Sequence, residues 1–323
     1  MPKPKVKVFV TRKIPEIGVK LLKQKGYKVT VYNKNKAISR GALLRGVKGV
    51  DAILCLLTET IDASVLNVAG PQLKVVANYA VGYDNINLKA TNKFKVKVTN
   101  TPGVLDGAVA DHTMALMLAV ARRVVEADKF TRAGKYKGWE PMLFMGNDVS
   151  QKTIGIIGTG RIGTGVAERS KGFNMPVLYY DIKPNRYIEK KCGAKKVSLD
   201  TLLKKSDFVS VHVPLLPSTK HLIGAKQFSA MKSSACLVNT SRGPVINELA
   251  LVKALRKGQI TAAALDVFEY EPQIVAGLKK LPNVILTPHI ASSTIEARDG
   301  MAKLAAQGII DVLSGRMPSN LVK

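Results

Sequence analysis

Three residues whose side chains can transfer protons or bind anions each follow an apolar segment in the second half of the chain. They are Arg242, after residues 235–239, Glu271, after 262–267, and His289, after 284–287. Reduction of a carbonyl needs such groups, because the alkoxide that forms must receive a proton. Histidine can supply it near neutral pH, and a carboxylate beside the ring favours the imidazolium and holds it. We therefore predict His289 as the acid/base, Glu271 as the residue that orients and charges it, and Arg242 as the bidentate ligand of a 2-oxo acid.

A glycine-rich turn precedes these residues in the chain. Residues 158–163 match the pattern G-x-G-x-x-G, directly after the apolar segment 153–157 and before a helix-like segment. The first glycine allows a tight turn, the second lets the backbone approach a pyrophosphate, and the third lets the helix pack closely on the sheet. The N–H groups at the start of the helix face the phosphates. We therefore assign to dinucleotide binding the residues Gly158, Thr159, Gly160, Arg161, Ile162 and Gly163.

Asp181 bears on the choice of cofactor. It ends the next apolar segment, 177–180, where a carboxylate can bind a ribose hydroxyl. The same carboxylate repels a 2′-phosphate, so the sequence favours NAD over NADP. Lys183 and Arg186 follow closely and could weaken this preference, which leaves NADP as the alternative.

Strand-length apolar segments alternate with helical segments along the chain, which predicts an α/β fold with two doubly wound parallel-sheet domains and a cleft between them. Such sheets bind ligands at the carboxyl ends of their strands, so the three chemical residues and the glycine turn share one edge. Asp62 is predicted to cap a helix, and a last helix spans 292–313. The predicted strands are 6–11, 28–32, 51–57, 73–79, 95–99, 153–157, 177–180, 196–197, 208–213, 235–239, 262–267 (with Asp266 on the strand) and 284–287.

One long helix is predicted from residue 108 to 132, ending at Gly134. Its first half is apolar on nearly every face, which indicates burial either within one domain or against a second subunit. The length favours a subunit interface.

Composition narrows the class of protein. The chain has 323 residues, 46% of them hydrophobic, which is ample for a large core. The formal charge of +27 would attract nucleic acid, but the lysines are spread along the chain, so we expect no specific nucleic-acid binding. We see no membrane-spanning segment and no signal peptide. Cys55, Cys192 and Cys236 lack metal-ligand spacing, which favours reduced, mostly buried thiols and a cytoplasmic location.

The remaining histidines give weaker signals. His112 on the apolar helix fits a core histidine, His212 lies at a strand end without an acidic partner in sequence, and His221 has no context. We assign no metal site. Taken singly, Arg242 and Glu271 could form an ordinary surface ion pair.

Nearly the whole chain resembles the D-isomer-specific 2-hydroxyacid dehydrogenase family. The glycine turn and five further segments carry the resemblance: 78–86 (NYAVGYDNI), 100–105 (NTPGVL), 239–243 (NTSRG), 265–272 (LDVFEYEP) and 286–290 (LTPHI).

The resemblance implies roles for individual residues. Arg242, Glu271 and His289 match the catalytic residues of the family. Val81 and Gly82 would offer backbone N–H groups to the substrate carboxylate, and Asp266 would contact the carboxamide side of the nicotinamide. We also assign four residues at strand ends to cofactor binding, namely Val213, Pro214, Thr240 and Ser241.

The resemblance also implies a domain arrangement. A discontinuous substrate-binding domain would comprise residues 1–101 and 291–323, and a dinucleotide-binding domain residues 102–290. The last helix would pack on the first domain, and a cleft crossed twice by the chain could close and exclude water. The helix at 108–134 would pair with its copy in a homodimer.

Within the family, residues 9–12, residues 103–111 and Trp139 most resemble glyoxylate/hydroxypyruvate reductases, also called D-glycerate dehydrogenases. Trp139 would wall the substrate pocket, from its own subunit or a partner. Thr159, Ala291 and Asn87 depart from the usual residues, and Ala291 would restrict the loop of His289 if that position needed a positive φ. D-lactate, phosphoglycerate or phosphite dehydrogenases of the same family remain alternatives, as does an NAD-binding corepressor that acts through protein interactions.

Overall fold

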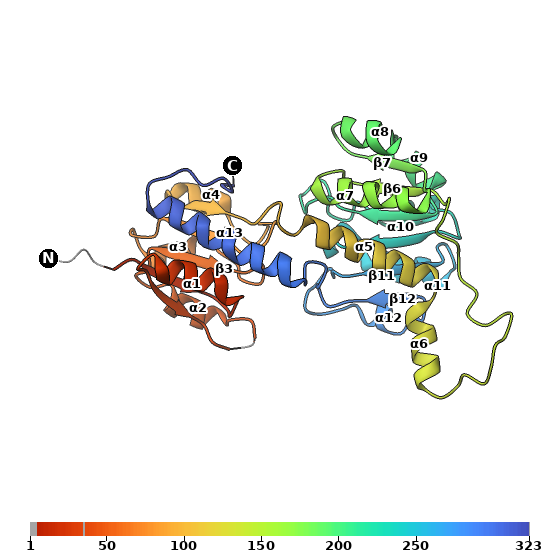
Figure 1. Ribbon diagram of the computed structural model, residues 1–323, viewed down its shortest axis with the longest axis horizontal. Helices are drawn as coiled ribbons and strands as arrows, with labels where there is room; N and C mark the ends of the chain where they lie inside the picture. Colours follow the sequence, from red (N-terminus) through yellow and green to blue (C-terminus); the bar gives the residue numbers. More distant parts are fainter. Residues whose placement is uncertain (1–4, 35, 323) are drawn as a thin grey trace. The chain divides into compact units, whose positions relative to one another are not determined.

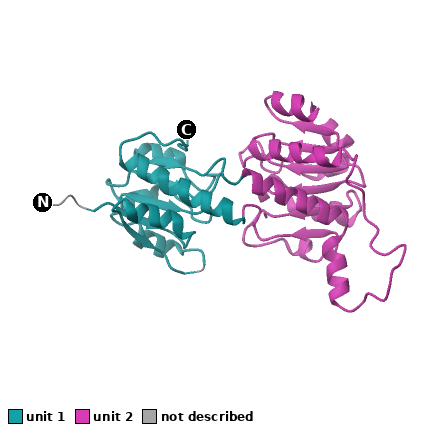
Figure 2. Ribbon diagram, in the orientation of Figure 1, with its two compact units in different colours: residues 1–105, 293–323 teal, residues 106–292 magenta. Residues whose placement is uncertain are grey.

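The computed structural model describes residues 5–34 and 36–322. The chain divides into two compact units, residues 1–105 with 293–323 (unit 1) and residues 106–292 (unit 2), as Figure 2 shows. The sequence placed the two crossings a few residues earlier, at 101–102 and 290–291. Each unit contains a parallel sheet with helices, which confirms the predicted α/β fold class.

Unit 1 is built on a five-stranded parallel sheet in the order β2-β1-β3-β4-β5. Strands β3 and β4 are buried at every residue, because helices pack on both faces of the sheet. The strands are β1 (Lys7–Val10), β2 (Lys28–Val31), β3 (Ala52–Cys55), β4 (Val75–Asn78) and β5 (Lys97–Thr99), and the helices are α1 (Glu16–Gln24), α2 (Arg40–Gly46), α3 (Ala63–Ala69), α4 (Leu88–Lys93) and α13 (Ile295–Leu313).

Helix α13 joins the end of the chain to its beginning. It packs on α1 and on β4, and in Figure 1 the blue helix runs beside the red one. The approach is close at Gly18, where a Cβ atom would lie 2.6 Å from the carbonyl oxygen of Ala302. The Tyr79 hydroxyl donates a hydrogen bond of 2.7 Å to the carbonyl oxygen of Arg298. Unit 1 therefore draws its core from both ends of the chain.

Unit 2 is built on a seven-stranded parallel sheet in the order β12-β11-β10-β9-β6-β7-β8. From β6 the chain runs outward through β7 and β8, and then returns to β9 and continues the other way. The sheet therefore changes direction between β6 and β9, the position at which such sheets bind ligands. The strands are β6 (Ile154–Ile157), β7 (Val177–Tyr180), β8 (Lys195–Lys196), β9 (Phe208–Val211), β10 (Cys236–Asn239), β11 (Ala262–Leu265) and β12 (Val284–Leu286).

Helices of unit 2 cover its sheet, and two hydrophobic clusters fill the space between them and the strands. The helices are α5 (Asp106–Ala121), α6 (Val124–Arg132), α7 (Arg161–Ser170), α8 (Arg186–Cys192), α9 (Leu199–Lys205), α10 (Ala225–Ala230), α11 (Glu248–Arg256) and α12 (Ala276–Lys279), with 3-10 turns at Lys171–Phe173 and Gly243–Val245.

The prediction of one continuous helix from 108 to 132 was wrong. Helix α5 ends at Ala121, and Arg123 adopts a left-handed conformation with φ 54° before α6 begins. The segment around Gly146 packs against the end of α5, where the N–H of Asn147 donates a hydrogen bond of 2.9 Å to the carbonyl oxygen of Ala121, the last residue of the helix. The Arg123 guanidinium pairs with Glu126 at 2.7 Å and fixes the turn. Within unit 2, α5 packs on α7, β10 and β11.

Three smaller expectations can be compared directly with the structure. Asp62 caps α3 by accepting hydrogen bonds from the N–H groups of Ser64 and Val65, as predicted. Asp266 lies one residue beyond β11 and not on the strand. Cys55 and Cys236 are free and buried, and burial raises the pKa of the Cys236 thiol to about 12.

No helix among the described residues is long and apolar enough to cross a membrane. In the same part of the chain, no group of three or more His, Cys, Asp or Glu side chains could hold a metal ion.

Candidate active site

The glycine turn joins β6 to α7 with little space to spare at two of its three glycines. Gly158 has φ +90°, and a Cβ there would lie 2.8 Å from the backbone N of Val213. A Cβ at Gly163 would lie 2.1 Å from the carbonyl oxygen of Gly158. At Gly160, by contrast, a Cβ would meet no heavy atom within 4 Å. The turn is therefore packed on its inner side and open at its middle glycine.

The start of α7 fits a pyrophosphate. Gly160 is the N-cap residue, and none of the described side chains caps this helix. The first N–H groups of α7, beginning at Arg161 and Ile162, follow the open glycine and carry the positive end of the helix dipole. These features match what the pyrophosphate of NAD requires. Val213, two residues after β9, lies next to Gly158, and Pro214 follows it in the chain.

Asp181 directly follows β7 and lies against the glycine turn. Its Oδ2 atom accepts hydrogen bonds from the backbone N–H of Thr159 at 2.7 Å and from the Thr159 hydroxyl at 3.1 Å. The Asn185 side chain donates to the carbonyl oxygen of Thr159 and to the Thr164 hydroxyl, each at 2.9 Å. The carboxylate predicted to bind the ribose is thus joined to the turn predicted to bind the pyrophosphate.

The loop that carries Arg242 is shaped by a buried asparagine that the sequence analysis did not single out. Asn239, 1% exposed, accepts hydrogen bonds from the N–H and the hydroxyl of Ser241 at 3.0 and 2.9 Å. Its amide donates to the carbonyl oxygen of Arg242 at 3.0 Å. The neighbouring Thr240 hydroxyl bonds the Thr113 hydroxyl of α5 at 2.8 Å. The turn after β10 is therefore held on both sides of Arg242.

Gly243 brings the Arg242 loop against the loop that carries Glu271. A Cβ at Gly243 would lie 1.9 Å from the carbonyl carbon of Phe268, so any other residue would force the two loops apart. The N–H of Phe268 in turn donates to Oε1 of Glu271 at 2.9 Å. Arg242 and Glu271 therefore lie on two loops in direct contact.

His289 and Glu271 form the central pair of the site. The Nδ1 atom of His289 lies 2.9 Å from Oε2 of Glu271. The two side chains are 28% and 31% exposed, so the pair is reachable from solvent. Because Glu271 occupies Nδ1, the Nε2 atom is the ring nitrogen that remains for a substrate. Nδ1 is assigned as the donor in this contact because a carboxylate oxygen can only accept.

The backbone at His289 is strained and is held by Asp266. His289 has φ 55°, which a non-glycine residue seldom adopts. Asp266 is fully buried, and its oxygens accept hydrogen bonds from the N–H groups of Ile290 at 2.9 Å and Ala291 at 2.7 Å. The hydroxyl of Thr287 donates to Oδ1 of Asp266 at 2.6 Å. The positive φ thus falls on His289 and not on Ala291, whose N–H is one of the groups that holds the loop.

The charge of Asp266 is stabilised in place. Burial alone would raise the pKa of the Asp266 carboxyl, but the nearby His112 imidazole and hydrogen bonds from Thr287 and the two backbone N–H groups outweigh it and hold that pKa below its usual value. His112, expected to be a core histidine, lies with Nε2 3.6 Å from Oδ1 of Asp266 and is 21% exposed. Both Asp266 oxygens therefore accept hydrogen bonds from the loop of His289. The sequence had predicted a contact of Asp266 with the nicotinamide and not this role.

A second histidine–carboxylate pair lies nearby and was missed in the sequence. Nε2 of His221 lies 2.6 Å from Oε1 of Glu269. Glu269 and Glu248 each accept a hydrogen bond from the other's backbone N–H, at 3.1 and 2.8 Å. His221 and Glu269 are 48 positions apart in the chain, so no local sequence pattern could reveal the pair. The reciprocal bonds between Glu248 and Glu269 tie α11 to the loop between β11 and Glu271.

Two substrate-binding residues inferred from the resemblance, Val81 and Gly82, lie in unit 1, directly after β4. The Asn100 side chain donates to the carbonyl oxygen of Val81 at 2.8 Å, and Asn78 donates to that of Gly82 at 2.7 Å. These bonds fix the peptide groups that follow Val81 and Gly82, the first of which carries the N–H of Gly82. Trp139 is 83% exposed in unit 2, in a stretch without helix or strand.

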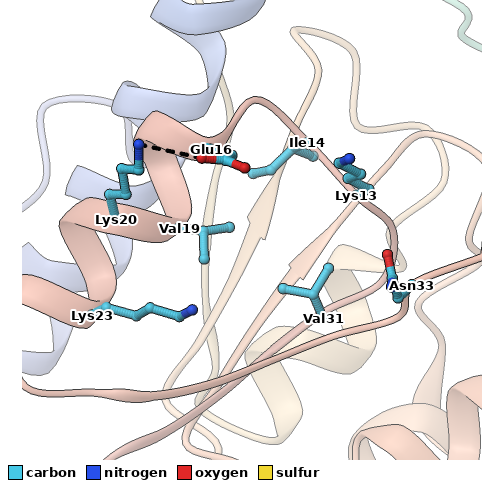
Figure 3. Close-up of a pocket in the computed structure, with 8 residues that line it drawn as sticks. All are labelled: Lys13, Ile14, Glu16, Val19, Lys20, Lys23, Val31 and Asn33. Carbon is cyan, nitrogen blue, oxygen red and sulfur yellow. Dashed lines mark ion pairs between the residues drawn. The ribbon is translucent and has the colours of Figure 1, made fainter.

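Unit 1 also has a surface hollow that contains none of these residues. It measures about 270 Å³ and lies between α1 and the end of β2 (Figure 3). Lys20 and Glu16 form an ion pair of 3.2 Å at its rim, but both side chains are largely exposed. Exposed pairs of this kind stabilise little, so we treat the hollow as ordinary surface.

Comparison with known proteins agrees with this geometry. Residues 114–291 match the model of the D-isomer specific 2-hydroxyacid dehydrogenase, NAD binding domain. The chain belongs to the D-isomer-specific 2-hydroxyacid dehydrogenase family, and it is an NAD-dependent oxidoreductase.

Similar proteins cover the full length. A glyoxylate reductase of Thermococcus litoralis is 50% identical over 322 residues, which is 98% of this chain and 97% of the relative. A crystal structure of a Thermus thermophilus protein is 40% identical with a TM-score of 0.93, covering 98% of this chain and 100% of that one. The NADPH-dependent glyoxylate/hydroxypyruvate reductase of Sinorhizobium meliloti, in complex with NADP and malonate, is 28% identical with a TM-score of 0.86, covering 99% and 97%.

Proposed function

We propose that the protein reduces glyoxylate and hydroxypyruvate to the corresponding D-2-hydroxy acids with NADH. The observation that carries the proposal is the 2.9 Å contact between His289 and Glu271 in the same unit as the glycine turn. The similarity to a glyoxylate reductase at 50% identity supports the choice of substrate.

Each residue has a defined task. NADH, when bound, supplies the hydride. His289 gives the proton from Nε2 to the oxygen of the former carbonyl, and Glu271 holds the ring through Nδ1 and stabilises its charged form. Arg242 binds the 2-oxo acid by two parallel hydrogen bonds and keeps its charge throughout. The N–H groups of Val81 and Gly82 bind the substrate carboxylate.

The cofactor is held by residues of unit 2. The turn from Gly158 to Gly163 and the first N–H groups of α7 bind the pyrophosphate, and Asp181 binds the ribose. Val213 and Pro214, Thr240 and Ser241 line the same strand ends. Asp266 acts on the nicotinamide side through the loop of His289, which its hydrogen bonds hold in place.

The working molecule is a homodimer formed through α5, α6 and the segment that follows them. Apolar side chains gather on this segment with much of their surface exposed, and burial against a second copy would remove them from water. They are Val124, Tyr136, Trp139, Met142 and Met145, which are 52%, 56%, 83%, 71% and 59% exposed. In this arrangement Trp139 walls the substrate pocket. Sedimentation equilibrium tests the dimer, and a monomer at micromolar concentration would contradict it.

Turnover of NADH with a panel of 2-oxo acids tests the function. We expect fast oxidation with glyoxylate and hydroxypyruvate, and slow oxidation with pyruvate and 3-phosphohydroxypyruvate. A preference for pyruvate or the phosphorylated acid would keep the mechanism and replace the substrate. If NADH binds but no acid is reduced, the enzymatic proposal fails and an NAD-binding interaction protein takes its place.

A further inference from the structure

The residue between the first two glycines of the turn bonds the carboxylate that is expected to face the ribose. Thr159 is 7% exposed, and both its N–H and its hydroxyl donate to Oδ2 of Asp181, at 2.7 and 3.1 Å. Any residue here supplies the N–H, but only a hydroxyl side chain of this size supplies the second bond. The contact therefore depends on the identity of the residue and not only on the shape of the turn.

The position of Thr159 is itself fixed from the other side. Asn185 donates to the carbonyl oxygen of Thr159 and to the hydroxyl of Thr164, each at 2.9 Å. The backbone N–H of Asn185 donates to the Tyr179 hydroxyl at 2.9 Å, and its Oδ1 caps α8. These contacts join the turn, the end of β7 and the start of α8 into one frame. The Thr159 hydroxyl thus meets Asp181 in a fixed geometry.

A carboxylate held in this way discriminates between the two nicotinamide cofactors. With Oδ2 bonded twice to the turn, the Asp181 carboxylate cannot rotate away from the ribose position without breaking a hydrogen bond to a charged group. A phosphate on the 2′-oxygen would meet this fixed charge. A hydroxyl on the same atom could instead donate to Oδ1, which accepts only a long hydrogen bond of 3.5 Å, from the N–H of Lys183.

Arg186, which follows Asp181 by five positions, has an acidic partner of its own. The guanidinium of Arg186 lies 2.9 Å from Oε2 of Glu189. The other oxygen of Glu189 accepts a hydrogen bond of 2.6 Å from the Tyr179 hydroxyl, which keeps the carboxylate in position. The Arg186 side chain is 83% exposed, so this pair adds little, and the discrimination rests on Asp181 itself.

We propose that the Thr159 hydroxyl is a specificity-determining group, which holds Asp181 in the orientation that accepts NADH and rejects NADPH. Thr159 acts through Asp181, so it is a positioning residue. The inference rests on the cofactor site assigned above. It goes beyond that site by giving the second residue of the turn a role in discrimination.

Equilibrium binding of NADH and NADPH, measured by cofactor fluorescence without any 2-oxo acid, tests the inference. Thr159→Val keeps the branched shape and removes the hydroxyl, so we expect the ratio of the NADPH to the NADH dissociation constant to fall by about tenfold. Thr159→Ser keeps a hydroxyl and should retain most of the wild-type ratio. Thr201→Val, a hydroxyl deletion in α9 away from the turn, is the matched control and should leave the ratio unchanged.

A double-mutant cycle shows whether the effect passes through Asp181. In an Asp181→Ala background, Thr159→Val should not change the ratio further. The inference is overturned if Thr159→Val leaves the ratio unchanged or lowers the affinity for both cofactors equally. It is also overturned if Thr159→Ser changes the ratio as much as Thr159→Val does, or if Thr159→Val changes the ratio fully in the Asp181→Ala background. A wild-type protein that binds neither cofactor would instead refute the cofactor site itself, and the inference with it.

Discussion

The substitution Asp266→Asn should disable the protein without touching any of the three residues predicted to do the chemistry. Asp266 is fully buried and accepts hydrogen bonds from the N–H groups of Ile290 and Ala291 and from the Thr287 hydroxyl. Asparagine has the same shape but only one acceptor oxygen. In either orientation its NH₂ group would face at least one of these donors.

The cost follows from the hydrogen bonds lost. In the less costly orientation, the amide nitrogen replaces Oδ2 and faces the N–H of Ala291, which is left buried without a partner. Losing a hydrogen bond to a charged acceptor and leaving a donor unsatisfied together lower the free energy of unfolding by about 3 kcal/mol. The left-handed backbone at His289 is itself unfavourable by roughly 1–3 kcal/mol and persists only while its surroundings hold it. Once released, His289 leaves Glu271, and kcat should fall by about 100-fold.

Three measurements separate the effects. Urea denaturation followed by circular dichroism gives the free energy of unfolding, steady-state kinetics gives kcat, and cofactor fluorescence gives the NADH dissociation constant, which should change only a few-fold. Asp207→Asn is a suitable control, because Asp207 also accepts a backbone N–H bond, from Thr153 at 2.9 Å, but is partly exposed. If Asp266→Asn has the same free energy of unfolding and the same kcat as the wild type, the account of the His289 loop is wrong.

Three further substitutions test other parts of the site. Gly243→Ala would place a Cβ 1.9 Å from the carbonyl carbon of Phe268, so we expect a loss of about 3 kcal/mol in urea denaturation and a matching loss of activity. Glu271→Gln removes the negative charge beside His289, so kcat should fall by about 100-fold while the NADH dissociation constant stays the same. Burial lowers the pKa of His212 to about 3, so the unfolded chain takes up a proton near pH 6.5 that the folded chain refuses. The free energy of unfolding should then fall by up to about 1.4 kcal/mol per pH unit below pH 6, and less steeply in His212→Gln.

For each of these three predictions, one result would contradict the reasoning. A soluble, fully active Gly243→Ala protein would mean that the two loops do not touch. For the glutamate variant the control is Glu269→Gln, two residues away, and an equal loss of kcat in both would point to a general disturbance of the loop. For His212, parallel stability curves of wild type and variant between pH 4 and pH 7 would show that the histidine is not buried in its neutral form.

Much of the fold could be predicted from the sequence because its signals are local. Buried parallel strands are continuous apolar runs, and the segment at β7 was predicted with the bounds the structure shows, Val177–Tyr180. The glycine turn was equally clear, and Gly158 and Gly163 stand where a Cβ would have no room. The carboxyl ends of parallel strands share one edge, which is why Arg242, Glu271 and His289 could be grouped before their distances were known.

What the sequence did not reveal depends on contacts between distant residues. The break between α5 and α6 is fixed by Gly146 and Asn147, which follow an irregular stretch and meet the end of α5 only in the folded chain. The His221–Glu269 pair joins residues 48 positions apart. The hydrogen-bond donors to Asp266 lie 21 to 25 positions further along the chain. They belong to a loop whose backbone conformation cannot be predicted from its residue types.

The most direct test of the central proposal is the turnover of NADH with glyoxylate by the wild type and by His289→Gln, with NADH affinity measured on both. We predict that the wild type reduces glyoxylate and that the variant binds NADH with a similar dissociation constant but loses at least about 1,000-fold in kcat. A variant that retains near wild-type turnover would show that His289 does not supply the proton, and the proposed mechanism would have to be abandoned.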